Sequence, residues 1–180
     1  SKMGIEVDPP VVNWGKMLSY KTSMINDNTK GIEYLFKKNK ITLINGWASF
    51  IDKNTISVDN KNYEANYFVI ATGSEARCLK NIEFDEKVIV SSTGALELEK
   101  IPEKMIIVGA GVIGLEMGSI YSRLGTEVTV LEFFDKVLNG MDHDISKNFK
   151  SILQRQGFKF HLNCSVSMIA KEKKRCNSYF

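Results

Sequence analysis

The stretch KMIIVGAGVIGLEMGSIYSRLGTEVTVLE, residues 104–132, constrains this chain more than any other part of it. An apolar run leads directly into Gly109, Gly111 and Gly114, which fill a GxGxxG spacing. The first glycine allows a tight turn, the second lets a phosphate approach the backbone, and the third lets a helix pack closely on a strand. The stretch therefore predicts a strand, a glycine turn, a helix and a second strand, with a dinucleotide pyrophosphate at the helix N-terminus.

The residues around the glycines support this βαβ unit. Met105–Val108 carries no charge, so we expect a strand that is buried on both faces of a parallel sheet. Val128–Leu131 forms the second strand, and Gly125 stands where a C-cap glycine belongs. A glycine-rich turn in an unrelated α/β protein is the competing interpretation, which the agreement of all these signals disfavours. The apolar residues at helical spacing are Ile113, Met117, Ile120, Tyr121 and Leu124.

Glu132 ends the second strand, 23 residues after the first glycine (132 − 109 = 23). At about this separation the dinucleotide fold places the acid that binds the hydroxyls of the adenosine ribose. A carboxylate there repels a 2′-phosphate, and the next residues, Phe133, Phe134 and Asp135, supply no arginine to hold one. The sequence therefore predicts NAD rather than NADP.

Composition places the chain among ordinary soluble proteins with one large or two small domains: 180 residues, 43% hydrophobic, net charge +3. Basic residues are scattered except near the C-terminus, which predicts no nucleic-acid-binding face. No apolar run approaches the roughly 18 residues of a membrane span, and no signal peptide is evident. The beginning, SKMGIEVDPP, starts in the middle of a pattern, so we expect a natural start further upstream.

The cysteines and histidines identify no catalytic or metal centre. Cys78, Cys164 and Cys176 are far apart and form no CxxC pair, so we expect free thiols in a reducing compartment. His143 and His161 have no cysteine, serine or carboxylate at a spacing that would mark a site. We therefore predict no metal and no catalytic residue within these 180 residues.

The N-terminal half predicts a long helix followed by a small sheet. Asp8, Pro9 and Pro10 can start a helix over residues 11–38. Its apolar stripe, expected to serve in packing, is Trp14, Met17, Leu18, Met24, Ile25, Ile32, Leu35 and Phe36. A period of two then predicts an antiparallel meander, with turns at Asn45-Gly46 and Asp59–Asn62. Its three apolar segments are Ile41 with Leu43, Ala48 with Phe50 and Ile51, and Ile56 with Val58.

Tyr67–Ile70 is an uninterrupted apolar run, which predicts a buried strand. It leads into Thr72, Gly73 and Ser74, small residues that can bring backbone against a cofactor or simply end a strand. Lys80–Ile89 reads as a loop, and Ser91 can cap a short helix before Pro102. We place a domain boundary there, between residues 92 and 93.

The C-terminal part continues the alternation of strand and helix. Asp142 or Asp144 can cap a second helix that Gly157 closes, and a third strand follows. The order β, α, β, α, β is that of one mononucleotide-binding half with right-handed crossovers. Val166–Ala170 begins a further strand. The apolar helix face is Ile145, Phe149, Ile152 and Leu153, and the third strand contains Phe158, Phe160 and Leu162.

Six motifs occur in a fixed order across most of the chain: VIATGSE (69–75), SSTGAL (91–96), GAGVIGLEMGS (109–119), VTVLE (128–132), DISKNF (144–149) and QGFKF (156–160). Together they resemble the dihydrolipoamide dehydrogenases of the eukaryotic mitochondrial type. These enzymes belong to the flavin-dependent pyridine nucleotide-disulfide oxidoreductases. The resemblance implies an α/β fold, with part of an FAD-binding domain over residues 1–92 and a Rossmann-like NAD-binding domain over residues 93–180.

The resemblance also implies an activity for a longer protein. In that family dihydrolipoamide, bound to 2-oxo acid dehydrogenase complexes, passes electrons through a redox-active disulfide and FAD to NAD. The FAD phosphate fingerprint and CxxxxC lie upstream in the family, and the interface domain and catalytic His-Glu pair lie downstream. We therefore expect an internal piece of a homodimeric enzyme, inactive by itself, from the mitochondrial matrix, with plastid or cytoplasm as alternatives.

Site residues follow from the resemblance by position. The NAD pyrophosphate segment is Gly109, Ala110, Gly111, Val112, Ile113, Gly114 and Leu115, with Glu116 toward the nicotinamide, Glu132 on the ribose and Val166 offering backbone to adenine. On the FAD side, Thr72, Gly73 and Ser74 match the flavin nucleotide segment, and Ala48 stands where the family often has glycine. Glu116 facing solvent and Val166 as a core valine are the simpler interpretations. Another disulfide reductase, or an inert dinucleotide-binding module, is the alternative function.

Overall fold

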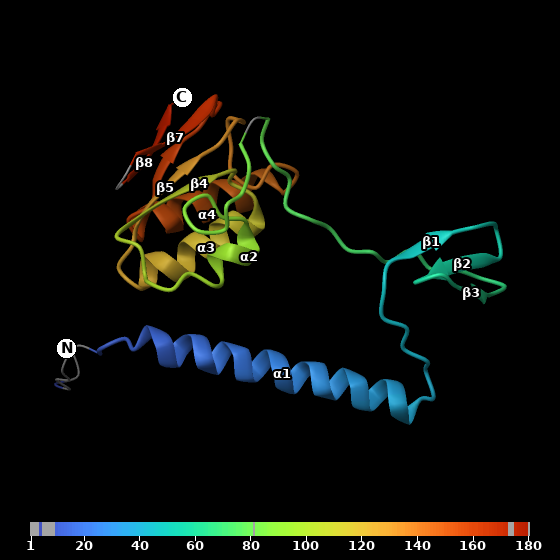
Figure 1. The fold of residues 1–180 in the computed structure, drawn as a ribbon. Coiled ribbons are helices and arrows are strands. Elements are labelled where there is room, and N and C mark those ends of the chain that lie inside the picture. Colours follow the sequence, from blue (N-terminus) through green and yellow to red (C-terminus); the bar gives the residue numbers. More distant parts are fainter. Residues whose placement is uncertain (1–3, 5–9, 81, 173–174, 180) are drawn as a thin grey trace. The chain divides into compact units, whose positions relative to one another are not determined.

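The computed structural model describes residues 4, 10–80, 82–172 and 175–179 (Figure 1). The chain forms two compact units, one of Lys16–Glu75 and one of Ser1–Gly15 with Ala76–Phe180. The predicted mixed α/β class is confirmed, since helices, one parallel sheet and two antiparallel sheets are present. The domain boundary expected between residues 92 and 93 stays a prediction.

Helix α1 spans Trp14–Lys38, close to the predicted residues 11–38. The expected start at Asp8 and Pro9 lies outside the described residues, and Pro10 precedes the helix. No residue of α1 is buried, and apolar stripe residues such as Met17, Ile25 and Ile32 are exposed. The expectation that this stripe packs is therefore wrong for these residues, whereas Trp14, at the start of the helix, is half-buried and contacts Tyr121. A stripe at helical spacing requires a matching apolar surface before it can be buried.

The predicted meander exists, but two of its three strands differ from expectation. Strands β1 (Ala48–Phe50), β2 (Thr55–Val58) and β3 (Lys61–Glu64) pair antiparallel in that order. Ile41 and Leu43 lie outside any strand, so the first predicted strand is wrong. The third strand comes instead from the polar stretch that reads as a turn. Asp59 and Asn60 alone make that turn, with φ of 48° and 63°, the conformation of a two-residue type I′ hairpin.

The predicted buried strand at Tyr67–Ile70 is wrong. This segment lies outside every strand of the described chain, and the side chains of Tyr67, Val69 and Ile70 are 91%, 91% and 75% exposed. Phe68 makes an edge-to-face contact with Phe50 at 5.1 Å between ring centroids. An apolar run becomes a strand only where a neighbouring strand accepts its backbone hydrogen bonds, and none is described here.

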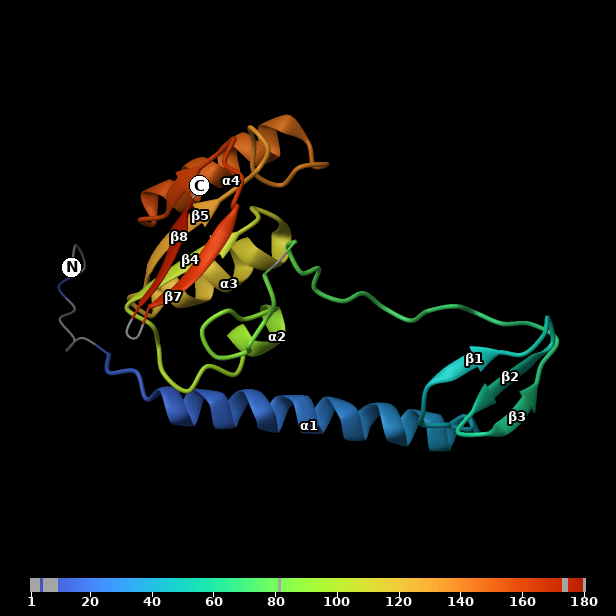
Figure 2. The same ribbon diagram turned by 45° about the horizontal axis from the view of Figure 1, so that its top comes forward.

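The second unit contains the predicted β, α, β, α, β order. Strands β4 (Lys104–Val108), β5 (Glu127–Leu131) and β6 (Lys159–His161) form a parallel sheet in the order β4-β5-β6. Figure 2 shows β4 and β5 of this sheet. Helix α3 (Val112–Arg123) connects the first pair of strands and α4 (His143–Arg155) the second. Both crossover helices contribute to one core, whose buried members are Ala110, Leu115, Val128, Val130, Val137, Leu138, Leu153 and Phe158.

The helix faces differ from the predicted ones in detail. On α3 the buried residues are Leu115, Gly118 and Tyr121, whereas Ile113 and Ile120 are exposed. On α4 Leu153 is buried, but Ile145 and Ile152 are exposed. A spacing of three or four residues fixes the period of a stripe but allows a rotation of one position around the helix axis. The residue that faces the sheet is therefore decided by packing.

Strand β4 is covered on one face only, which corrects the expectation of burial on both. Met105 and Ile107 are half-buried, and the partly buried Ile107 packs against the core cluster. Ile106 and Val108, which point to the opposite face, are 45% and 42% exposed. An uncharged strand is typical of a sheet with two covered faces, but the covering layer must be supplied by other segments.

Local capping signals were predicted correctly. Ser91 caps the short helix α2 (Ser92–Ala95), with its side chain accepting from Thr93 N at 3.2 Å. Asp142, rather than Asp144, caps α4, accepting from Asp144 N at 2.9 Å and Ile145 N at 3.1 Å.

The last two strands, β7 (Met168–Glu172) and β8 (Arg175–Tyr179), form an antiparallel pair. The expected strand thus starts at Met168, two residues after Val166. Within the described residues, no helix combines the length and apolar character needed to cross a membrane.

Candidate functional site

The glycine turn lies between the end of β4 and the first turn of α3, as its spacing predicts. Gly109 has φ of +100°, a conformation that favours glycine, and its N–H donates to the Leu131 carbonyl at 2.8 Å. Gly111 is the N-cap of α3, and a Cβ placed on it would meet no atom within 4 Å. The backbone at Gly111 is therefore open to a ligand, next to the free N–H groups of a helix N-terminus.

Gly114 brings α3 against the strand. An added Cβ would lie 2.8 Å from the Gly109 carbonyl oxygen and 2.9 Å from Ile107 Cγ2. Gly118, one turn later, is equally enclosed, with 2.7 Å to Ile107 Cδ1 and 2.8 Å to Phe158 Cε1. Sequence reasoning missed Gly118, although its spacing of four residues from Gly114 places both on the same face of the helix. These two glycines set the distance between α3 and the sheet.

The other residues of the fingerprint segment divide into core and surface. Ala110 and Leu115 are buried, so their side chains serve packing and only their backbone can face a ligand. Val112 and Ile113 are exposed at the open end of α3. Glu116 is also exposed, on the second turn of the helix.

Glu132 lies directly after β5, beside the glycine turn, and is only 8% exposed. Its Oε2 accepts from Ala110 N at 2.5 Å, and its Oε1 accepts from Phe134 N at 2.9 Å. A buried carboxylate requires such hydrogen bonds, because burial without them is costly. Each carboxylate oxygen has two acceptor positions, so both oxygens keep capacity for a further donor. The predicted ribose acceptor therefore stands at the fingerprint turn, where the distance along the chain had placed it.

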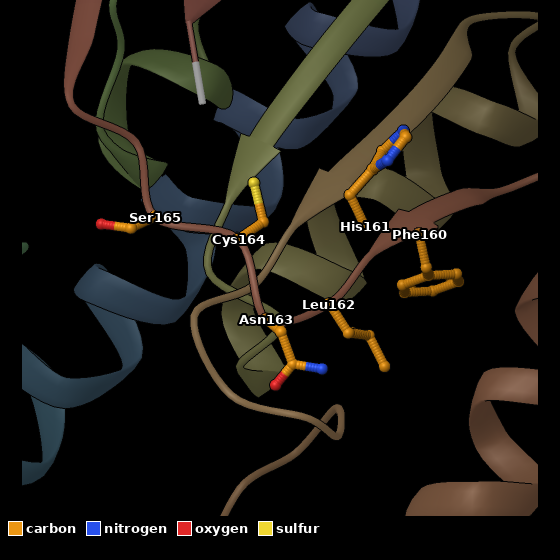
Figure 3. Close-up of a pocket in the computed structure, with 6 residues that line it drawn as sticks. All are labelled: Phe160, His161, Leu162, Asn163, Cys164 and Ser165. Carbon is orange, nitrogen blue, oxygen red and sulfur yellow. The ribbon is translucent and has the colours of Figure 1, made fainter.

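A shallow open hollow lies at the carboxyl end of β6 (Figure 3). In α/β sheets, ligands bind outside the carboxyl ends of the strands. The hollow is joined to Glu132 by backbone, because Glu132 N donates to the His161 carbonyl and Cys164 N donates to the Glu132 carbonyl, each at 2.8 Å. Val166, half-buried, follows two residues after Cys164. The residues that line the hollow are Phe160, His161, Leu162, Asn163, Cys164 and Ser165.

This arrangement fits the adenosine diphosphate part of a dinucleotide. The helix end of α3 offers N–H groups and the positive end of its dipole to a pyrophosphate. Glu132, at the end of β5, offers acceptors to ribose hydroxyls, next to the fingerprint turn at the end of β4. The hollow lies at the end of β6, the next strand of the sheet. The structure thus brings together the fingerprint turn at Ala110, Glu132 and the segment His161–Cys164 at the carboxyl ends of the strands. Glu116 lies on the second turn of α3, and its place at the site stays a prediction.

The residues predicted to contact FAD lie in the other unit. Ala48 is in β1, where it pairs with Val58 of β2. Thr72, Gly73 and Ser74 follow the exposed Tyr67–Ile70 segment, are exposed themselves, and lie outside any helix or strand. Their assignment to a flavin site stays a prediction.

Comparison with known proteins adds independent information. The family model described as "Pyridine nucleotide-disulphide oxidoreductase" matches residues 5–179. Mitochondrial dihydrolipoyl dehydrogenases from Schizosaccharomyces pombe, Dictyostelium discoideum and Homo sapiens are 48%, 42% and 45% identical. The matches cover 88%, 96% and 94% of this chain, but 32%, 36% and 34% of those proteins. The chain thus spans about a third of the length of the curated relatives it matches.

Two solved structures have the same fold. LpdA from Mycobacterium tuberculosis superimposes with a TM-score of 0.85 at 21% identity, over 98% of this chain and 40% of that one. A Cu(II) complex of the HOCl-induced flavoprotein disulfide reductase RclA from Escherichia coli gives 0.79 at 26% identity, over 93% and 39%.

Proposed function

The chain belongs to the pyridine nucleotide-disulphide oxidoreductase family, and from this premise we propose that it supplies the NAD site, and part of the FAD site, of a dihydrolipoyl dehydrogenase. The position of Glu132 carries the proposal: a buried carboxylate bonded to the fingerprint turn and free of an adjacent arginine. The names of relatives at 42–48% identity support the same activity.

In this proposal different residues bind different parts of NAD. The backbone of Gly109–Gly114 binds the pyrophosphate, with the α3 dipole contributing to its stabilisation. Glu132 accepts hydrogen bonds from the ribose hydroxyls. Val166 and the hollow beside it bind adenine, and Glu116 lies toward the nicotinamide. NAD, when bound, accepts the hydride that derives from dihydrolipoamide by way of the redox disulfide and FAD. The chain's own contribution is binding, orientation and the choice of NAD over NADP.

The remaining assignments extend the same proposal. Residues 1–92 belong to the FAD-binding domain and residues 93–180 to the NAD-binding domain, with Ala48 and Thr72–Ser74 at the flavin nucleotide. In this proposal the intact enzyme is a homodimer that serves 2-oxo acid dehydrogenase complexes. A location in the mitochondrial matrix is supported by the names of the relatives, which are mitochondrial dihydrolipoyl dehydrogenases. No CxxxxC pair occurs in these 180 residues, so the redox disulfide belongs to another part of the enzyme.

Calorimetry of nucleotide binding tests the proposal. We expect NAD to bind and NADP to bind far more weakly, because a 2′-phosphate next to Glu132 is repelled. Glu132→Ala should weaken NAD binding by about 1–3 kcal/mol, the value of charged hydrogen bonds. Glu103→Ala, which removes an exposed carboxylate just before β4, is the matched control and should leave the affinity unchanged.

If the wild type and Glu132→Ala bind NAD with equal affinity, Glu132 does not contact the nucleotide. Equal use of NADPH and NADH by the full-length enzyme would favour another disulfide reductase, the competing function. Activity requires its own measurement: the full-length enzyme should reduce NAD with dihydrolipoamide, and the 180 residues alone should not. Turnover by the 180 residues would overturn the assignment of the disulfide to another part.

A further inference from the structure

Glu132 does more in this structure than face the expected position of a ribose. Its Oε2 accepts from the N–H of Ala110, the second residue of the fingerprint turn, at 2.5 Å. Its Oε1 accepts from Phe134 N at 2.9 Å, which fixes the carboxylate from the other side. The carboxylate is therefore part of the support of the turn before any nucleotide arrives.

The carbonyl of Ala110 is bound by the loop that follows β5, the loop that begins with Glu132. Leu138 N donates to the Ala110 carbonyl at 2.9 Å. Leu138 has φ of +51°, a left-handed conformation that costs a non-glycine residue about 1–2 kcal/mol. Both polar groups of Ala110 thus bond to residues 132–138, which we term the clasp. The fingerprint turn has its shape imposed by the loop after β5 as well as by its own glycines.

The clasp is in turn fixed to the edge of β6. Glu132 N donates to the His161 carbonyl, Cys164 N donates to the Glu132 carbonyl, and Asn163 N donates to the Phe134 carbonyl at 3.0 Å. Figure 3 shows His161, Asn163 and Cys164 along the strand exit that lines the hollow. A continuous series of hydrogen bonds therefore runs from the hollow through Glu132 to the pyrophosphate turn.

We infer that Glu132 is a positioning residue for the pyrophosphate turn, so that the ribose and pyrophosphate subsites share one carboxylate. This inference rests on the proposed function for the identity of the ligand, but the positioning itself is a property of the free protein. The spare acceptor positions on each oxygen allow ribose hydroxyls to bind while Ala110 stays bonded. Replacing Glu132 thus disturbs both subsites at once.

Amide exchange and NMR of the nucleotide-free protein test the positioning role. We expect the Ala110 N–H to exchange at least about tenfold faster in Glu132→Gln than in the wild type, since a charge-assisted bond is lost. Its proton resonance should also move upfield, because a short bond to a carboxylate shifts an amide proton downfield. Glu132→Asp retains the charge but has a shorter side chain, so its Ala110 exchange rate and proton resonance should lie between those of the wild type and of Glu132→Gln. Glu103→Gln, an exposed carboxylate outside the clasp, should change neither.

Unchanged exchange and an unchanged Ala110 resonance in Glu132→Gln would overturn the inference. These measurements need no nucleotide, so they stand even where NAD binding fails. Should Glu132→Gln not fold, Glu132→Asp decides by its Ala110 signal. Its side chain is one methylene shorter and moves the carboxylate away from the Ala110 N–H, so the signal should lie upfield of the wild-type position, and an unshifted signal would overturn the positioning role.

Binding of two ligands tests the sharing of the carboxylate. ADP-ribose spans both subsites, whereas adenosine has the ribose but no pyrophosphate. We expect Glu132→Gln to lose more affinity for ADP-ribose than for adenosine. Removal of a negative charge by itself favours a pyrophosphate, so a larger loss for ADP-ribose has to come from the displaced turn. Equal losses, or a smaller loss for ADP-ribose, would overturn the sharing.

Discussion

The indole of Trp14 lies 5.9 Å from the ring of Tyr121, with the two planes inclined at 52°. Both side chains also hold the segment around α2. Trp14 Nε1 donates to the Leu98 carbonyl at 2.8 Å, and the Tyr121 hydroxyl donates to the Ala95 carbonyl. Tyr121 is 2% exposed. The first residue of α1 is thereby tied to helix α3 through an aromatic pair and two carbonyls of the intervening segment.

Tyr121→Phe should destabilise the protein by about 1–3 kcal/mol, because it leaves the buried Ala95 carbonyl without its donor. Urea unfolding followed by Trp fluorescence measures this. Tyr20→Phe, at an exposed position of α1, is the control and should change nothing. A stability equal to the wild type for Tyr121→Phe would mean that the hydroxyl contributes no net hydrogen bond.

The ionisation of Tyr121 should lower the free energy of unfolding at high pH. Burial, and then the nearby charge of Glu97, raise the pKa of Tyr121 above its usual value near 10. The folded state therefore keeps its proton where the unfolded chain loses it. This contribution is complete below pH 10 and is lost as the pH rises through the folded-state pKa. The free energy of unfolding should fall more steeply above pH 10 in the wild type than in Tyr121→Phe, and parallel curves would contradict the cause.

Gly118→Ala should cost about 1–3 kcal/mol, because its Cβ would meet the side chains of Ile107 on β4 and of Phe158, the residue just before β6. Gly31→Ala in α1 is a useful contrast, since no atom lies within 4 Å of its added Cβ. At that helical position alanine should stabilise by about 0.5–1 kcal/mol. Denaturant curves of the two variants should move in opposite directions. A neutral Gly118→Ala would show that α3 can move away from the sheet without cost.

Glu127 on β5 should titrate below its usual range. A hydrogen bond and charge from Lys159, followed by the charge of Lys104 at 3.8 Å, lower the pKa of this carboxyl from 4.5. The stability that it contributes is present above pH 4.5 and is lost as the pH falls through the folded-state pKa. NMR titration should show the lowered midpoint. Lys159→Met should raise the pKa of Glu127 back toward its usual value. An unchanged pKa would mean that another group lowers it.

Several elements were predictable because their signals are local. The glycine turn, the Ser91 cap and the helix after Asp142 depend on residues within a few positions of one another. For the α4 cap the sequence left Asp142 and Asp144 open, since either carboxylate could reach the first turn. The structure selects Asp142 by its bonds to Asp144 N and Ile145 N.

Predictions failed where burial depends on distant segments. The face of β4 at Ile106 and the stripe of α1 are apolar in sequence, but Ile106 and stripe residues such as Ile25 are exposed. The hairpin strand Lys61–Glu64 is polar, so the pairing with β2, rather than its own composition, makes it a strand.

The candidate site was predictable in its positions but not in its connections. The distance from Gly109 to Glu132 follows from the length of a helix and a strand, which the fold fixes. The bonds from Glu132 to Ala110 and Phe134, and from Leu138 to Ala110, depend on the path of the clasp. That path includes a left-handed leucine, for which the sequence contains no signal.

The exposed Tyr67–Ile70 segment has a practical consequence for handling the chain. Aromatic and β-branched side chains with unpaired backbone form a template on which a second molecule can add a strand. A concentrated sample should consequently lose soluble protein faster than a dilute one at the same temperature, with growth of thioflavin-positive material. A lysine at Val69, the most exposed aliphatic position of the segment, is the simplest means of extending shelf life.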